Sequence, residues 1–71
     1  MIFDYSKLRG RIVEKYGTQC EFAKAFGISN NSMSRKLNNK NSFSVDDIIK
    51  ITQMLDIQPK DVSSYFFTEK V

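Results

Sequence analysis

The sequence predicts an all-α fold, a compact domain of five helices, and two observations support this prediction. Apolar residues recur at spacings of three and four, as on the buried face of a helix. Residues that favour helix starts and ends, chiefly Ser, Thr, Asp and Gly, separate these periodic segments. We find no strand pattern, repeat or linker. The 71 residues suit a single domain, residues 1–71, in which residues 67–71 are expected to fray.

The first two helices are bounded by cap residues. The first is expected to follow Asp4 as its N-cap and to run to Tyr16. Its predicted buried face holds Tyr5, Leu8, Ile12 and Tyr16. The second is expected to start after Thr18, which would form a capping box with Glu21, and to end at Gly27. Its predicted buried stripe consists of Phe22, Ala23 and Phe26.

A third helix is expected within the segment GISNNSMSRKL, which runs from Gly27 to Leu37. Ser29 is a cap residue, and Met33 and Leu37 lie four apart, so both apolar side chains would face inward with Ile28. The outer side would then hold Asn30, Asn31, Ser34 and Arg35, with the exposure of Lys36 left open. A loop is the alternative, because Asn and Ser also favour turns. The cap and the apolar spacing favour the helix.

Two further helices complete the predicted fold. Ser44 is the expected cap of the fourth, with Asp47 three residues later. The predicted inner face of this helix holds Val45, Ile48, Ile51, Thr52 and Leu55, with Ile49 alongside. Pro59 suits the first turn of a short fifth helix, whose apolar contacts would be Val62, Tyr65 and Phe66. One helix face does not bury Tyr65, Phe66 and Phe67 together, so we expect these aromatics to form a partner or dimer surface, with Phe67 exposed.

The charge is unevenly distributed along the chain. The formal net charge is +3, but residues 18–43 hold four basic residues against one acidic residue. Residues 44–71 hold three basic and five acidic residues. A basic zone of this kind would attract a phosphate backbone. The alternative is a solvated surface with an ordinary scatter of charge.

The composition argues against catalysis, metal binding and membrane insertion. The chain lacks histidine, and the single Cys20 does not form a zinc site unaided. The three glycines are too widely spaced for a phosphate-binding loop. We therefore expect no enzymatic activity, no cofactor, no metal, no small-molecule substrate and no redox role for Cys20. Because there is no signal sequence and no apolar run of roughly 18 residues, we expect a cytoplasmic protein without a membrane partner.

The predicted second and third helices resemble a helix-turn-helix unit, in which a glycine-containing turn joins two short helices. Ala23 lies four residues before Gly27, where a small side chain lets the helices approach, and Met33 would lock the third helix onto the second. This layout resembles the Cro/repressor-type helix-turn-helix family of phages and bacteria. The segments FDYSKLRGRIVEKYGTQ, SRKLNNK and DVSSYFF resemble small phage proteins of the Cro-like and modulator-of-repression group. One departure is Lys36, which stands where the broader family usually has an apolar residue.

The resemblance implies a regulator of a phage lysis–lysogeny switch. Some members of this group bind operator DNA, and others contact the main repressor of the phage. The first expectation is therefore a homodimer that reads double-stranded operator DNA in the major groove with its third helix. The alternative is an antirepressor that binds the phage repressor protein and has only weak DNA binding of its own.

The outer side of the third helix has the chemistry to read bases. Asn can bond adenine and Arg can bond guanine through two hydrogen bonds each, and Ser reads either. The expected base contacts are Asn30, Asn31, Ser34 and Arg35, and the resemblance adds Gln19. The expected phosphate contacts are Thr18, Lys36, Asn38, Asn39 and Lys40. Structural roles are the alternative for Thr18 as a helix cap and for Asn38 and Asn39 as a helix end.

Overall fold

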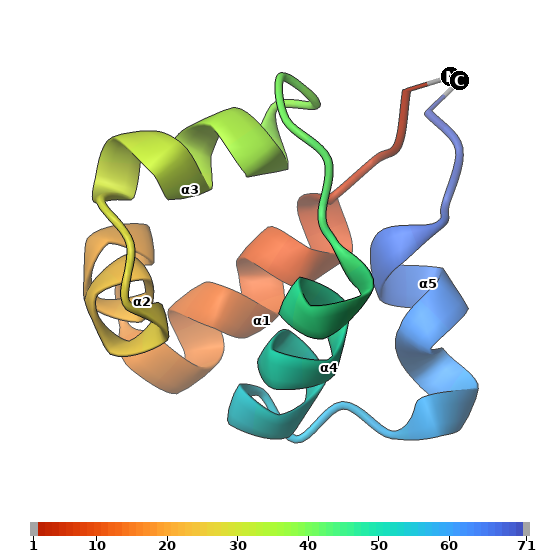
Figure 1. The fold of residues 1–71 in the computed structure, drawn as a ribbon. Coiled ribbons are helices and arrows are strands. Elements are labelled where there is room, and N and C mark those ends of the chain that lie inside the picture. Colours follow the sequence, from red (N-terminus) through yellow and green to blue (C-terminus); the bar gives the residue numbers. More distant parts are fainter. Residues whose placement is uncertain (1, 71) are drawn as a thin grey trace.

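The computed structural model describes residues 2–70 and is all-helical within them (Figure 1). The helices are α1 (Ser6–Tyr16), α2 (Gln19–Phe26), α3 (Asn30–Leu37), α4 (Val45–Met54) and α5 (Val62–Phe66), with a 3-10 turn at Pro59–Asp61. The predicted fold class is confirmed, and so is α3, for which the sequence also allows a loop. Met1 and Val71, the two ends of the predicted domain, lie outside the described residues. No helix of the described part is long and apolar enough to cross a membrane.

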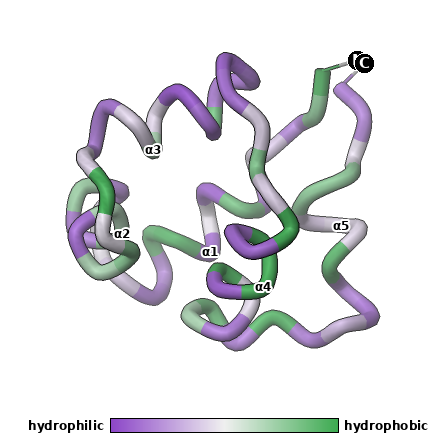
Figure 2. Tube along the Cα trace, in the orientation of Figure 1, coloured by the Kyte–Doolittle hydropathy of each residue, from purple (hydrophilic) through white to green (hydrophobic). Residues whose placement is uncertain are grey.

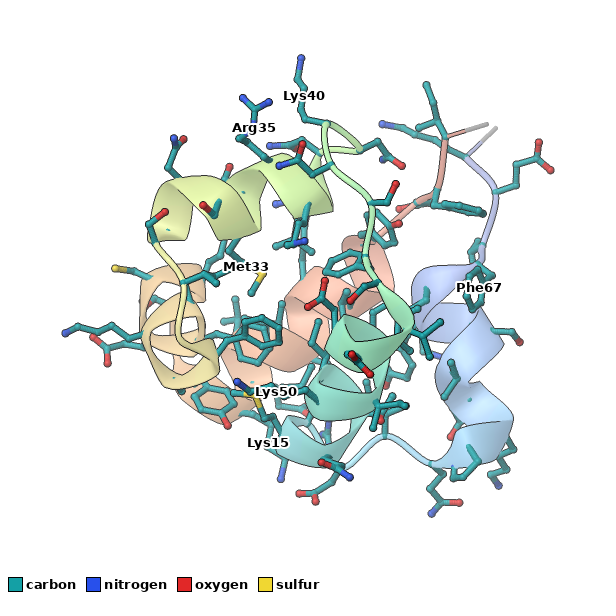
Figure 3. All side chains as sticks on the ribbon, in the orientation of Figure 1. Lys15, Met33, Arg35, Lys40, Lys50 and Phe67 are labelled. Atoms are coloured by element: carbon teal, nitrogen blue, oxygen red, sulfur yellow. The ribbon has the colours of Figure 1, made fainter. Side chains whose placement is uncertain are left out.

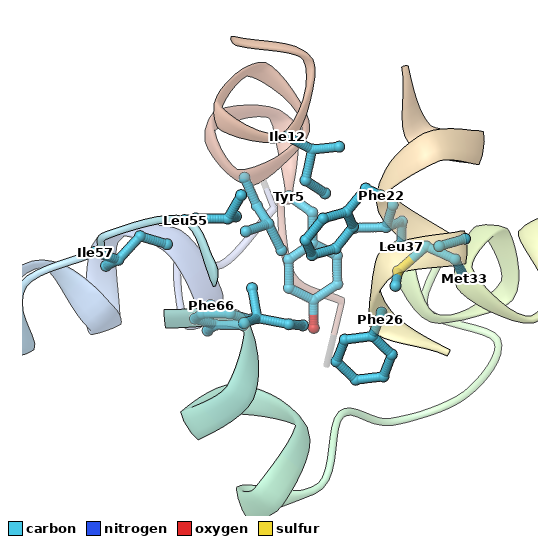
Figure 4. Close-up of a cluster of buried hydrophobic side chains, with 12 residues drawn as sticks. Tyr5, Ile12, Phe22, Phe26, Met33, Leu37, Leu55, Ile57 and Phe66 are labelled. Carbon is cyan, nitrogen blue, oxygen red and sulfur yellow. The ribbon is translucent and has the colours of Figure 1, made fainter. Parts of the chain in front are cut away.

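One hydrophobic cluster joins the five helices. Its largest fully buried side chains are Phe22, Phe66, Leu8, Ile12, Met33, Ile51 and Leu55. The ring of Tyr5 lies near the centre, with side chains of α2 and α3 on one side and Phe66 on the other (Figure 4). Every residue predicted to be buried on α1, α2 and α3 lies in this cluster or packs against it. The helical periodicity therefore identified these three faces correctly.

Side-chain caps begin three helices as predicted, through the hydroxyls of Thr18, Ser29 and Ser44. The predicted capping box at Thr18 is only half formed: the Glu21 N–H donates to Thr18 Oγ1 at 3.1 Å, but within residues 2–70 the Glu21 carboxylate accepts no bond from the Thr18 N–H. The box at Ser44 is complete, since Asp47 Oδ2 accepts a hydrogen bond from the Ser44 N–H at 3.0 Å. These caps fix where α2, α3 and α4 begin.

Three basic side chains bind carbonyl oxygens at helix C-termini. The bonds are Arg9 Nη2 to Leu37 O at 2.9 Å, Arg11 Nε to Leu55 O at 2.9 Å, and Lys50 Nζ to Phe26 O at 2.6 Å. Cations stabilise this end of a helix because its last carbonyls lack intrahelical partners and its dipole is negative there. Part of the positive charge of the protein therefore stabilises helix ends within the fold. The hydrogen bond from Arg9 joins α1 to the end of α3.

The segments before α1 and after α5 run side by side (Figure 1). The Asp4 N–H donates to Thr68 O at 2.7 Å and the Lys70 N–H donates to Ile2 O at 2.8 Å, around a single antiparallel bridge between Phe3 and Glu69. The sequence predicts a frayed tail here, whereas residues 68 and 70 form backbone hydrogen bonds in the structure. Asp4 is also not the N-cap of α1, which is Tyr5.

Helix α4 differs from the prediction in what it buries. Ile51 and Leu55 are fully buried, but Val45 is 73% exposed and Ile49 is 50% exposed. The prediction assigned six positions, five apolar residues and Thr52, to the inner side of α4. At about 100° per residue, these positions span a wider arc of the helix than the core contacts. The predicted inner face of α4 was therefore too broad, and the excess apolar positions lie at the surface.

Candidate functional site

The outer side of α3 is the first candidate surface. Met33 is 0% and Leu37 is 3% exposed, so the opposite side of the helix faces solvent. At about 100° per residue, Asn31 and Arg35 lie opposite Met33, and both are exposed. Figure 3 shows Arg35 and Lys40 pointing away from the body of the molecule, and the trace of α3 is largely hydrophilic (Figure 2). We call this surface the α3 face; it consists of Gln19, Asn30, Asn31, Ser34, Arg35 and Lys40.

A hydrogen bond joins the first residues of α2 and α3. Gln19 Nε2 donates to Asn30 Oδ1 at 3.0 Å. Gln19 keeps a free amide oxygen and Asn30 keeps free N–H donors, so the pair can still accept from and donate to a ligand. The structure thus brings together two residues that are expected to contact bases but lie 11 positions apart.

The polar residues at the end of α3 bond to one another. Ser34 is half-buried, and its hydroxyl accepts from Asn38 Nδ2 at 3.2 Å. Asn38 Oδ1 accepts from Arg9 Nη2 at 2.7 Å. Thr18 caps α2 through its hydroxyl. Thr18 and Asn38 therefore have the structural roles that the sequence leaves open for them, and their expected phosphate contacts stay predictions.

The structure settles the exposure of Lys36, which the sequence leaves open. Its Nζ donates to Asp47 Oδ2 and to Ser42 O, both at 3.1 Å, and its side chain is only 20% exposed. Leu37 takes the core position, which leaves Lys36 about 60° around the helix from Met33, beside α4. The ammonium group is therefore part of the junction between α3 and α4, and its expected phosphate contact stays a prediction.

Asn39 has a structural role, which the sequence leaves open for it, whereas Lys40 projects into solvent; the expected phosphate contacts of both stay predictions. Asn39 Oδ1 accepts from the Phe3 N–H at 3.0 Å, and Asn39 Nδ2 donates to Phe3 O at 2.9 Å. This side chain thus holds the N-terminal segment against the end of α3, so its amide is already used. Lys40 is exposed and has no ion-pair partner within residues 2–70.

The three consecutive aromatics are not one surface. Phe66 is 1% exposed and belongs to the core, so its assignment to a partner surface is wrong. Tyr65 is half-buried, with Lys7 Nζ 4.7 Å from the centre of its ring. Phe67 is 52% exposed, as predicted, and its ring lies 5.8 Å edge-on from that of Phe3.

A second candidate surface lies between α4 and residues 67–70, which we call the tail. A cavity of about 170 Å³ opens there, lined by residues from both ends of the chain, by Ile48 of α4, and by the residues Asn39, Asn41, Ser42 and Phe43 between α3 and α4. Exposed Val45 and Ile49 continue from the cavity-lining Ile48 along α4. We call this surface the α4–tail face; it consists of Val45, Ile48, Ile49, Phe67 and the cavity. Sequence reasoning missed Val45 and Ile49, although the unusual breadth of the apolar pattern on α4 was a usable signal.

Comparisons with known proteins decide the family. The family model described as "Protein of unknown function (DUF739)" matches residues 1–69. The chain belongs to the DUF739 family. It is also similar to the modulator of repression of the temperate bacteriophage TP901-1 from Lactococcus lactis, for which a solution structure is known. The match covers 100% of this chain and 96% of the chain of that modulator. The identity is 46% and the TM-score is 0.84. No curated protein gives a significant match.

This DUF739 protein is therefore similar, over its whole length, to a phage regulatory protein. The predicted likeness to the modulator-of-repression group is confirmed, and so is the five-helix fold. The finer assignment to the Cro/repressor-type family stays a prediction.

Other reactive groups of the DUF739 protein form no evident site. Within residues 2–70 no group of three or more His, Cys, Asp or Glu residues is placed to hold a metal ion. Cys20 is an exposed free thiol in the first turn of α2. The expected lack of enzymatic activity stays a prediction.

Proposed function

We propose that this protein is an antirepressor of a phage lysis–lysogeny switch, and that it acts by binding the phage repressor protein through the α4–tail face. The observation that carries the proposal is the exposure of Val45, Ile49 and Phe67, at 73%, 50% and 52%, where Phe67 lines the cavity and the other two continue from its lining residue Ile48 along α4. Full-length similarity to a modulator of repression supports it, because that relative is named for regulating repression.

The energetics of the α4–tail face favour a protein partner. Burying a Val, Ile or Phe side chain completely is worth about 1.5–3 kcal/mol, so each half-exposed side chain has about half of that left to gain. A small domain gains nothing for its own fold by placing three such side chains in water. A partner that covers them recovers this free energy, as at the apolar centre of protein interfaces.

Calorimetric titration of the purified protein with the repressor of the same phage tests this proposal. We expect a saturable complex, and we expect the protein to release the repressor from operator DNA in a mobility-shift assay. A titration without heat change, together with an operator complex that persists at excess protein, would contradict the proposal.

Direct DNA binding through the α3 face is the second candidate function. The Gln19–Asn30 hydrogen bond favours it, because it holds two amide side chains next to exposed Asn31 and Arg35. Asn and Arg are the residues that read base edges through paired hydrogen bonds. A mobility shift on the phage regulatory DNA, with the protein alone and at several salt concentrations, tests this candidate. Binding that is absent, or that does not weaken with salt, argues against it.

The two candidates use different faces and are separable. Substitution of Val45 and Ile49 should weaken the repressor complex and leave DNA binding unchanged. Substitution of Asn31 and Arg35 should weaken DNA binding and leave the repressor complex unchanged. A protein in which both activities depend on the same face would contradict this division.

A further inference from the structure

The cavity beside α4 has the dimensions and the lining of a receptor for one side chain. Its volume is about 170 Å³, and its apolar lining residues are Phe3, Tyr5, Phe43, Ile48, Phe66 and Phe67. In other proteins, an apolar cavity of about 150 Å³ accommodates a benzene molecule. One aromatic ring or one large aliphatic side chain therefore matches the available space.

The rings around the cavity are held in fixed positions. Phe43 packs edge-on against Tyr5 and against Phe66, with ring centres 5.3 and 5.5 Å apart. Phe3 is fixed through its backbone by Asn39 and packs edge-on against Phe67. A guest side chain would therefore meet a preformed site, which lowers the entropic cost of binding.

Apolar surface continues from the cavity around α4. At about 100° per residue, Val45 and Ile49 lie between Ile48, which lines the cavity, and Asp46, which faces solvent. On the other side of the cavity, Phe3 is bridged to Glu69. The face thus has an apolar centre and a carboxylate at each of two edges, as in protein interfaces with a charged rim.

The charges at these edges indicate the kind of partner. Asp46 is exposed and has no ion-pair partner within residues 2–70, whereas at the other edge Glu69 is followed by Lys70, which is also exposed and without an ion-pair partner there. The basic residue closest along α4, Lys50, bonds to the end of α2. Arg35 and Lys40 point away from Phe67 in Figure 3. The α4 edge is therefore acidic and the tail edge carries both signs, so a partner with a basic group on the α4 side of an apolar anchor would complement this arrangement.

We propose that the cavity receives a single aromatic or large aliphatic side chain of the phage repressor, and that a basic repressor residue beside this anchor pairs with Asp46. This inference rests on the proposed antirepressor function and adds the chemistry of the partner. The anchor side chain supplies most of the affinity, as expected for a residue that fills a pocket at the centre of an interface. The Asp46 carboxylate mainly raises the association rate.

Four variants test the proposal by titration with the purified repressor. Phe67→Ala removes one wall of the cavity, and Asn41→Phe places a ring at its rim, where Asn41 contributes to the lining. Each should weaken repressor binding about tenfold or more. Val13→Ala is the matched control, because Val13 is 54% exposed on α1 and does not line the cavity; it should change the affinity less than about twofold. Asp46→Lys should slow association with the repressor. Glu21→Lys, on α2, changes the net charge by the same amount and should not slow association.

Amide and methyl chemical shifts of the unmodified protein provide a test that does not depend on the folding of any variant. On addition of repressor, the signals of the cavity residues and of Val45 and Ile49 should move, and those of Asn31 should not. Repressor binding that is intact in Phe67→Ala and Asn41→Phe, or shifts confined to α3, would overturn the cavity assignment and leave the antirepressor function standing. No binding by the unmodified protein would overturn both. If the protein alone forms dimers that Phe67→Ala dissociates, the occupant is a second copy, and the proposal also fails.

Discussion

Lys36 Nζ donates to Asp47 Oδ2 at 3.1 Å, and this ion pair joins the last turn of α3 to the capping box that begins α4. Desolvation is the largest influence on the Asp47 carboxyl and raises its pKa. The hydrogen bond from the Ser44 backbone, with the hydrogen bond and charge of Lys36, outweighs it, so the pKa lies below the ordinary value of 3.8. The charged form of Asp47 is thus stabilised by folding.

The free energy of unfolding should fall in acid partly through Asp47. Because its folded pKa is depressed, its contribution is complete above the unfolded pKa and is lost as the pH falls from about 5 through the lower folded value. Urea unfolding at pH 7 and pH 3 measures the loss, and Asp47→Asn should reduce it. Some loss should remain, since hydrogen bonds from Ser6 and Lys15 also lower the pKa values of Asp4 and Asp56. Asp46→Asn is the control; an equal loss in Asp47→Asn and the parent would contradict the prediction.

Lys36→Ala should destabilise the protein by about 1–2 kcal/mol, because it removes two hydrogen bonds of a partly buried ammonium group. Lys40→Ala removes an exposed lysine from the neighbouring loop and should change stability by less than about 0.5 kcal/mol. Chemical denaturation of both variants measures the difference. A Lys36→Ala variant of unchanged stability that binds DNA more weakly would instead support the phosphate contact predicted from the sequence.

Asn39→Ala should cost about 1–2 kcal/mol, since it removes both hydrogen bonds to the Phe3 backbone and leaves a residue with a φ of 62° that alanine tolerates poorly. Asn39→Gly loses the same bonds but adopts this backbone easily, so it should cost less than Asn39→Ala. In both variants the Phe3 amide should exchange its hydrogen faster. Asn41→Ala is the control, and unchanged exchange at Phe3 would show that the contact is not maintained in solution.

Gly27→Ala and Gly10→Ala should have opposite effects on stability. Gly27 ends α2 with a φ of 103°, and a Cβ there would meet no atom within 4 Å, so the cost is one of backbone conformation, about 1–2 kcal/mol. Gly10 lies inside α1, also with nothing within 4 Å of a Cβ. Alanine there should stabilise the protein by about 0.5–1 kcal/mol. Thermal unfolding of the two variants compares them, and effects of the same sign would contradict this.

If the α3 face reads DNA, Arg35→Ala should weaken binding by about 1–3 kcal/mol and relax specificity at one base pair. Lys40→Ala should weaken binding to all DNA sequences alike. It should also reduce the salt dependence of binding by the amount that corresponds to about one lost phosphate contact. Quantitative mobility shifts on a set of single-base operator variants distinguish these patterns. A uniform loss in Arg35→Ala would mean that this residue contacts phosphate and not a base.

The local pattern was sufficient for much of the fold. The caps at Thr18, Ser29 and Ser44 and the glycine at Gly27 are local features, in which a side chain or a backbone conformation acts within a few residues. The core positions Met33 and Leu37 follow from helical spacing for the same reason. The outward direction of Asn31 and Arg35 follows from those two core positions.

The sequence by itself determined the five helices, the starts of α2, α3 and α4, and which side of α3 is polar, because these depend on contacts between near neighbours in the chain. Only the tertiary structure decided that Lys36 pairs with Asp47, that Asn39 binds Phe3, and that Phe66 is buried while Val45 and Ile49 are exposed. These outcomes depend on how much of each helix its neighbours cover. A polar side chain such as that of Lys36 or Asn39 has the same chemistry whether it contacts a partner or another part of its own chain. The sequence alone therefore does not distinguish these two outcomes.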